Sequence, residues 1–191
     1  MFSLQQFTNK FKDLPAKSLD AFVNLATEET FKKNDFFIKE GEVGKDFYIV
    51  KSGIVRSFYA DEKGKEHTRT IFTAGKTTGA LSSLVSGMPS ILTYECLTDC
   101  TVYKIVYQDF MALTLKDHHI LRFYNQMLEK VFLLLEARIY ELAVLNATER
   151  YLKLKKEIPQ IETLIPQYHI ASYLNISAVQ LSRIRKEIYS K

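Results

Sequence analysis

The chain has 191 residues, of which 47% are hydrophobic and 25% charged, and it carries a net charge of +4. This length accommodates one medium and one small domain with a real apolar core. The longest apolar run near the N-terminus is too short and interrupted for a signal or membrane segment, so a cytoplasmic protein without membrane partners is expected. Cys96 and Cys100 are too few for an iron–sulfur cluster or structural zinc site, and are expected to be free thiols.

The residue pattern of the N-terminal half changes near Thr30. Residues 3–26 are predicted to be helical, with Leu14-Pro15 as a second start signal. All seven glycines then fall between 41 and 87, among short runs rich in aromatic and β-branched residues. This pattern predicts a compact β sandwich or barrel. The predicted strands are 36–39, 47–51, 54–60, 67–72, 92–97 and 101–105, with a hairpin tip at 61–65.

The pattern becomes helical from Tyr107 onward, with a short helix at 108–115 and a long one at 117–145. Apolar residues form a heptad seam along the long helix, with Asn125 at the one missing step. The seam consists of Leu121, Leu128, Phe132, Leu135, Ile139 and Leu142. A second apolar flank, which can lie on the β domain, consists of Val131, Leu134 and Ala143. The seam favours a symmetric dimer, although a single broad core-facing stripe would give the same pattern.

The segment from Asn146 to Glu149 breaks the seam, which predicts a hinge and domain boundary. Thr148 is the predicted cap of a new helix at 149–156, and Pro166 is placed to start another helix.

Residues 170–184 have the pattern of two short helices joined by a tight turn. Ile170, Ala171 and Leu174 form one apolar face, and Leu181 and Ile184 form the other. Asn175 tolerates the left-handed backbone that the turn requires. Ser177 is predicted to cap the second helix, with Gln180 completing a capping box.

Excess positive charge is confined to this end of the chain. Residues 1–145 contain 18 basic and 18 acidic side chains, whereas residues 146–191 contain 8 basic and 4 acidic ones. This distribution is typical of a nucleic-acid-binding module, although a solvated lysine-rich face would give the same count.

The order of these elements resembles the Crp/Fnr family of bacterial transcription regulators over nearly the whole chain. The motifs that carry the resemblance are Gly41-Glu42, Phe47-Tyr48-Ile49-Val50, Gly53-Ile54-Val55, Gly79-Ala80-Leu81-Ser82-Ser83, Met88-Pro89-Ser90 and Asn146-Ala147-Thr148 with Arg150. Tyr151-Leu152 and Ser182-Arg183-Ile184-Arg185 are similar to the small-domain variety found in Bacteroidetes.

This resemblance implies an α+β protein in three parts. Residues 1–116 would form a cyclic-nucleotide-binding-like, cupin-like β-roll (a double-stranded β-helix), 117–145 a dimerisation helix, and 146–191 an all-α helix-turn-helix domain.

The cassette that binds the cyclic phosphate in this family departs from the family pattern. Members that bind cyclic AMP carry a Glu and an Arg where this chain has Ala80 and Ser90. Loss of the Arg forfeits about 1.5 to 3 kcal/mol, which disfavours cyclic AMP. The corresponding pocket of this chain is expected to bind another small molecule or to be vestigial. The candidate effector-binding residues are Gly79, Ala80, Leu81, Ser82, Ser83 and Ser90. The four histidines lack metal spacing, so we expect neither a metal nor another cofactor.

The second helix of the pair is the expected DNA-reading helix. Ala178 and Val179 stand where strong base readers of the family have Arg and Glu, so base discrimination would rest on Gln180, Ser182 and Arg183. Arg183 is the predicted guanine contact. Phosphate contacts are assigned to Tyr168, Arg185 and Lys186, although a solvated helix end would explain the last two equally. The predicted DNA-binding set is Tyr168, Ser177, Val179, Gln180, Ser182, Arg183, Arg185 and Lys186.

These features predict a homodimeric transcription regulator that binds double-stranded DNA under control of an unknown effector, with RNA polymerase as a further candidate partner. Its two reading helices would enter major grooves ~34 Å apart on a pseudo-palindromic site. The alternative is a sensor or scaffold β-roll whose helical tail docks on another protein. An enzyme is not expected, because no catalytic constellation, P-loop or dinucleotide fingerprint is present in the sequence.

Overall fold

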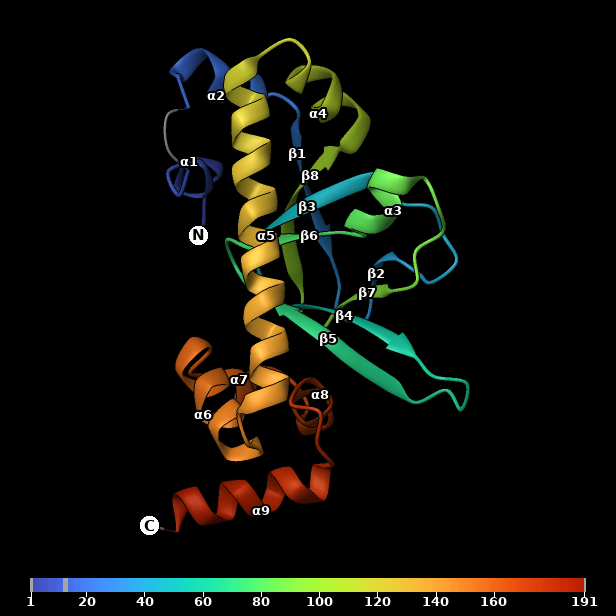
Figure 1. Cartoon of the computed structure of the whole chain (residues 1–191), viewed down its shortest axis with the longest axis vertical. Coiled ribbons are helices and arrows are strands. Elements are labelled where there is room, and N and C mark those ends of the chain that lie inside the picture. Colours follow the sequence, from blue (N-terminus) through green and yellow to red (C-terminus); the bar gives the residue numbers. More distant parts are fainter. Residues whose placement is uncertain (1, 12–13, 191) are drawn as a thin grey trace. The chain divides into compact units, whose positions relative to one another are not determined.

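The computed structural model describes residues 2–11 and 14–190 of an α+β protein. The chain divides into two compact units. The first contains residues up to Ser57 and Ile71–Val131, and the second contains Phe58–Thr70 with the chain from Phe132 onward. The element order is shown in Figure 1.

Two four-stranded sheets form the β-roll. The first has the order β1 (Ala26–Phe31), β8 (Cys100–Val106), β3 (Asp46–Ser52) and β6 (Thr77–Thr78). The second has the order β2 (Phe36–Ile38), β7 (Thr93–Cys96), β4 (Val55–Ala60) and β5 (Glu66–Phe72). All six predicted strands are present, whereas β1 and β6 were not predicted. The hairpin tip at 61–65 is confirmed by a hydrogen bond from the Asp61 amide to the Lys65 carbonyl.

The helices of the first unit are α1 (Leu4–Thr8), α2 (Ala16–Val23), α3 (Leu81–Ser86), α4 (Tyr107–Thr114) and the first part of α5 (His118–Val144). The helical prediction for 3–26, with a second start at Leu14-Pro15, is confirmed by α1 and by α2, which begins after Pro15, but its C-terminal bound is wrong, because α2 ends at Val23 and β1 begins at Ala26. Lys12 and Asp13, which that prediction included, lie outside the described residues. β1 escaped detection because its sequence, Ala-Thr-Glu-Glu-Thr-Phe, contains few apolar residues.

Aromatic side chains join the helices of the first unit to the sheet. Phe123 of α5 meets Phe22 and Phe11 edge to face, at ring-centroid distances of 5.0 and 4.8 Å. Phe110 packs likewise on Phe47 of β3. The α5 residues buried in this core are Ile120, Phe123 and Met127. The predicted flank is therefore wrong, since Leu134 and Ala143 are exposed.

The second unit contains the C-terminal part of α5 and four further helices: α6 (Ala147–Glu157), α7 (Ile161–Leu164), α8 (Gln167–Tyr173) and α9 (Ala178–Tyr189). Helix α6 is capped by Asn146 rather than by the predicted Thr148. The Asn146 side chain accepts from the Glu149 amide, and the Glu149 side chain accepts from the Asn146 amide. This reciprocal capping box satisfies two amide donors and starts the helix two residues earlier than predicted.

A buried ion pair joins β4 to β7. Arg56 Nε and Nη2 lie 2.7 and 2.5 Å from Glu95 Oε2, and their side chains are 4% and 11% exposed. The Leu97 amide donates to the Ile54 carbonyl, which places the two charged residues opposite each other on antiparallel strands. Removing the Arg56 charge alone would take this buried cation away from the Glu95 carboxylate.

We expect Arg56→Ala to lower the free energy of unfolding by about 3 to 5 kcal/mol, because it leaves the Glu95 carboxylate buried without its partner. The double variant Arg56→Met/Glu95→Leu should lower the free energy of unfolding less than Arg56→Ala alone does. Urea unfolding of the variants tests this coupling, and a double variant whose loss equals the sum of its two single variants would contradict it.

Candidate functional site

Helices α8 and α9 are joined by a turn in which Asn175 has φ +54°. The Ile176 amide donates to the Ala171 carbonyl at 3.0 Å, and the Asn175 amide donates to the Ser172 carbonyl at 3.1 Å. This pair of bonds is the Schellman arrangement that ends a helix through one left-handed residue. The prediction of Asn175 as the turning residue is confirmed.

The apolar residues predicted to hold the two helices together are buried. Ile170 and Leu174 are fully buried on α8, and Leu181 and Ile184 are buried on α9. Ala171 is also buried, as a close helix crossing requires. The Ser177 hydroxyl accepts from the Gln180 amide at 3.1 Å, whereas the reciprocal bond of the predicted capping box is not present between these described residues.

The outer face of α9 gathers most of the predicted reading residues. Val179 is 62% exposed. Gln180, Ser182, Arg183 and Lys186 are also exposed. Within the described residues, no hydrogen bond or ion pair engages the side chains of Arg183 or Lys186. Tyr168, on α8, is 60% exposed.

Arg185 is placed differently from its prediction as a phosphate contact. Its Nε lies 2.5 Å from Glu162 Oε1 in an ion pair that lacks hydrogen-bond alignment. The guanidinium therefore faces α7 within the same unit.

Glu162 of α7 is the centre of a polar cluster that ties α6 and α9 together. Its carboxylate accepts from Tyr151 at 2.7 Å, Lys155 at 2.8 Å and Tyr189 at 2.8 Å. Burial alone would raise the pKa of Glu162, but hydrogen bonds from Lys155, Tyr151 and Tyr189 outweigh it and lower the pKa to about 2. The carboxylate thus stays ionised and keeps α9 attached to the unit.

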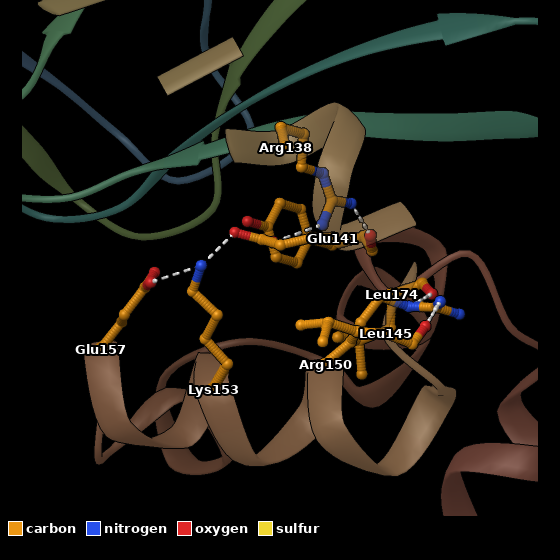
Figure 2. A network of polar contacts seen from close by, with 8 residues as sticks. Arg138, Glu141, Leu145, Arg150, Lys153, Glu157 and Leu174 are labelled. Carbon is orange, nitrogen blue, oxygen red and sulfur yellow. Dashed lines mark hydrogen bonds and ion pairs between the residues drawn. The ribbon is translucent and has the colours of Figure 1, made fainter. Parts of the chain in front are cut away.

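A second polar network connects the end of α5 to α6 and α8 (Figure 2). Arg138 donates to Glu141 and to the Tyr173 carbonyl. Lys153 of α6 pairs with Glu141 and with Glu157. The C-terminal part of α5 therefore belongs to the same polar framework as the helix pair.

The predicted hinge at 146–149 is bridged within this unit. Arg150 donates from Nη1 to the Leu145 carbonyl at 2.5 Å and from Nε to the Leu174 carbonyl at 3.2 Å. One side chain thus spans the α5–α6 junction and also reaches the turn after α8.

The seam of α5 is open to solvent along the C-terminal part of the helix. Phe132 and Ile139 are 64% and 69% exposed, and Leu135 and Leu142 are also exposed. Toward the N-terminus of the helix, Leu121 is exposed and Leu128 is half-buried. Solvent-exposed apolar side chains in such number mark an interaction surface.

The candidate effector residues lie at β6, α3 and the loop before β7. Gly79 has φ +134°, a conformation that strains other residues, and a Cβ there would crowd the Asp46 carbonyl oxygen at 3.2 Å. Ala80 is buried in a core cluster, and Leu81 is half-buried at the start of α3.

The three candidate serines differ in whether their hydroxyls are free to contact an effector. Ser83 is buried, and its hydroxyl accepts from the Gly44 amide and donates to the Met88 carbonyl. Ser90 is buried, and its hydroxyl bonds to the backbone of Leu92. Ser82 is exposed. Ser83 and Ser90 therefore hold the cassette loop together.

The residues that sequence reasoning missed are Glu162, Arg138 and the partners of Arg150. No sequence pattern indicated a role for Glu162, because it lies on α7, a four-residue helix that is too short to show helical periodicity. Tyr151 and Lys155 are four residues apart on one face of α6, and this spacing could have predicted a shared acceptor.

Comparison with known proteins is consistent with this architecture. Residues 28–117 match the cyclic nucleotide-binding domain. The chain is 26% identical over 132 residues to the cAMP-dependent protein kinase type II regulatory subunit of Drosophila melanogaster, a match that covers 69% of this chain and 33% of that protein. The chain thus spans about one third of this curated relative's length.

Solved structures with the same fold include bacterial regulators. FixK2 from Bradyrhizobium japonicum superposes with a TM-score of 0.76 at 20% identity, over 86% of this chain and 85% of that one. The global regulator CLP from Xanthomonas campestris gives 0.70 at 16% identity, over 92% of each chain. A Eubacterium rectale protein described as a regulator of the crp/fnr family gives 0.73 at 16% identity, over 95% and 88%. Residues 28–117 therefore resemble a cyclic nucleotide-binding domain, and the chain shares its fold with these solved structures, one of which is described as a regulator of the crp/fnr family.

The described residues contain no helix long and apolar enough to cross a membrane. They also contain no group of three or more His, Cys, Asp or Glu side chains that could hold a metal ion.

We expect Glu162→Gln to lower the free energy of unfolding at pH 7 by about 1.5 to 3 kcal/mol, the range for hydrogen bonds to a charged group. The pKa of Glu162 is about 2 in the folded chain against an ordinary value of 4.5. The stabilisation is thus full above pH 4.5 and is lost as the pH falls toward 2. Unfolding of both proteins across this range tests the effect, and a gap that widens on acidification would contradict it.

Proposed function

We propose that the chain is a homodimeric, DNA-binding transcription regulator of the Crp/Fnr type, and that α8 and α9 are its helix-turn-helix. The observation that carries this proposal is the division of α9 into a buried apolar side and an exposed polar and basic side. A helix that docked on a protein partner would present an exposed apolar face, whereas Val179 is the one large apolar residue among the five reading positions of the outer face. Major-groove recognition requires such exposed donors and acceptors.

Internal pairing engages several basic residues of the second unit and leaves others exposed. Arg150, Lys153, Lys155 and Arg185 are engaged by carbonyls or carboxylates of the unit itself. Arg183 and Lys186 of α9 are exposed and remain available for a nucleic acid. In this proposal Arg183 contacts guanine, and Lys186 and Tyr168 contact phosphates. Arg185 holds the reading helix in place through Glu162 instead of contacting DNA.

The dimer forms through the exposed seam of α5. Burying Phe132, Leu135, Ile139 and Leu142 against the same residues of a second copy removes their apolar surface from water. Two chains then present two α9 helices to successive major grooves, ~34 Å apart.

The β-roll is the proposed sensor, and its effector is not cyclic AMP. The hydroxyls of Ser83 and Ser90 are occupied by the cassette's own backbone, and Ala80 and Ser90 supply neither a carboxylate nor a cation. Ser82 and backbone groups are the remaining candidates for effector contacts. The structural neighbour CLP is described as responsive to c-di-GMP, a second reason to test nucleotides other than cyclic AMP. We propose no enzymatic activity and no metal or other cofactor, and RNA polymerase is a proposed partner of the DNA complex.

DNA binding is tested by titrating the chain against random duplex DNA at several salt concentrations. Binding should weaken steeply with salt, because protein cations replace counterions on the phosphates. Arg183→Ala with Lys186→Ala should reduce affinity at least ~10-fold, since two exposed cations that would neutralise phosphates are lost. Lys156→Ala, which removes an exposed charge from α6, is the matched control. Equal affinity of the double variant and the wild type would contradict the assignment.

Dimerisation is tested by sedimentation of an Ile139→Glu variant. A carboxylate at a seam position that is 69% exposed in one chain should leave the monomer folded but oppose its pairing, because like charges would meet across the two-fold axis. We expect a wild-type dimer and a variant monomer with unchanged helix content. A monomeric wild type, or a variant that still dimerises, would refute the seam as the interface.

A further inference from the structure

The last residues of α8 are held by three separate elements of the second unit. Ser172 contacts β5 of the hairpin at 58–70, where its hydroxyl accepts from the Thr68 amide at 2.9 Å and donates to the Glu66 carbonyl at 3.1 Å. β5 is the edge strand of its sheet. The serine therefore occupies backbone groups that a further strand would otherwise pair.

The next residue is held by the end of α5. Arg138 donates to the Tyr173 carbonyl, lies 4.1 Å from the centroid of the Tyr173 ring and donates to Glu141 at 3.2 Å. A planar guanidinium can make these contacts simultaneously, because its donors point in fixed directions around one plane. Figure 2 shows Arg138 and Glu141 side by side on the last turns of α5.

The third residue is held by α6, since Arg150 donates to the Leu174 carbonyl. Together with the two Schellman bonds, these contacts give every carbonyl at the end of α8 a partner. Those of Ala171 and Ser172 accept from the turn itself, and those of Tyr173 and Leu174 accept from arginines of other helices. Cations at this position also interact favourably with the negative end of the helix dipole.

We infer that Arg138 is a positioning residue that fixes the angle between the dimer helix α5 and the α8–α9 pair, with Ser172 fixing the same pair to the hairpin. This inference rests on the proposed function. In a dimer, the direction of each α9 relative to α5 determines how far apart the two reading helices lie. The clamp at the end of α8 thus selects half-site spacing, whereas the outer face of α9 selects bases.

The two roles are separable, because Arg138 and Ser172 lie on α5 and α8, outside the exposed reading positions of α9. Moving one half-site by one base pair shifts it by about 3.4 Å and rotates it by about 34°. A rigid dimer loses simultaneous engagement of both half-sites after such a shift, whereas a loosened one can follow.

The experiment uses a duplex that the full-length wild-type chain has selected from a random library. Dissociation constants are measured by fluorescence anisotropy for that duplex, for versions with one base pair added or removed between the half-sites, and for a single half-site. We expect the affinity of the wild type to fall at least ~10-fold when one base pair is added or removed, whereas the affinity of Arg138→Ala should fall less than ~3-fold. The affinity of Arg138→Ala for a single half-site should stay within ~2-fold of wild type. Arg138→Lys keeps the charge but lacks the planar fork, so it should relax the spacing preference too.

Ser172→Ala removes the hairpin contact and should relax the spacing preference to a smaller degree, and it carries the test if Arg138→Ala does not fold. Lys156→Ala is the charge-matched control and should keep the wild-type spacing preference. Variants with the full wild-type preference, or with equal losses on all duplexes including the half-site, would overturn the inference. A wild type that selects no duplex would instead contradict the proposed function itself.

Discussion

The end of helix α8 imposes the constraint on which the arrangement of the second unit depends. The last carbonyls of a helix have no partner within it and must find donors elsewhere. In this chain the turn supplies two donors through Asn175 and Ile176, and α5 and α6 supply the others through Arg138 and Arg150. Because both arginines belong to neighbouring helices, satisfying the backbone of α8 also fixes its place among them.

The Glu162 cluster fixes α9 to its neighbouring helices, as Arg138 and Arg150 fix α8. Three hydrogen-bond donors and the Arg185 guanidinium, all from α6 and α9, converge on one carboxylate, so the inner side of α9 is held by polar as well as apolar contacts. Several basic residues of the C-terminal segment, whose excess of positive charge predicted nucleic-acid binding, form ion pairs or hydrogen bonds within the unit instead. Fewer basic side chains of the C-terminal segment are therefore available to a nucleic acid than its composition indicates. Arg183 and Lys186, two of the basic residues that remain exposed, lie on the outer face of α9.

Local signals predicted the elements whose residues interact along the sequence. The strand runs, the long helix and the turn at Asn175 were predicted because periodicity, glycine placement and left-handed tolerance act over a few residues. β1 and α7 were not predicted, since the first has few apolar residues and the second spans four residues. The side of α5 that enters the core was also missed, because two apolar stripes on one helix look alike until their partners are known. The Gly44 partner of Ser83 and the Glu162 partner of Arg185 depend on tertiary contacts, which the sequence pattern does not encode locally.

Methylation interference on a duplex selected by the chain tests whether α9 reads the major groove, because methyl groups at guanine N7 block contacts there. We expect two symmetric patches of interference whose centres lie one helical turn, or about 10 to 10.5 base pairs, apart. Each patch should weaken when Arg183 is replaced by alanine. A single patch, or binding that methylation of the major groove leaves unchanged, would contradict a dimer that reads DNA through two copies of α9.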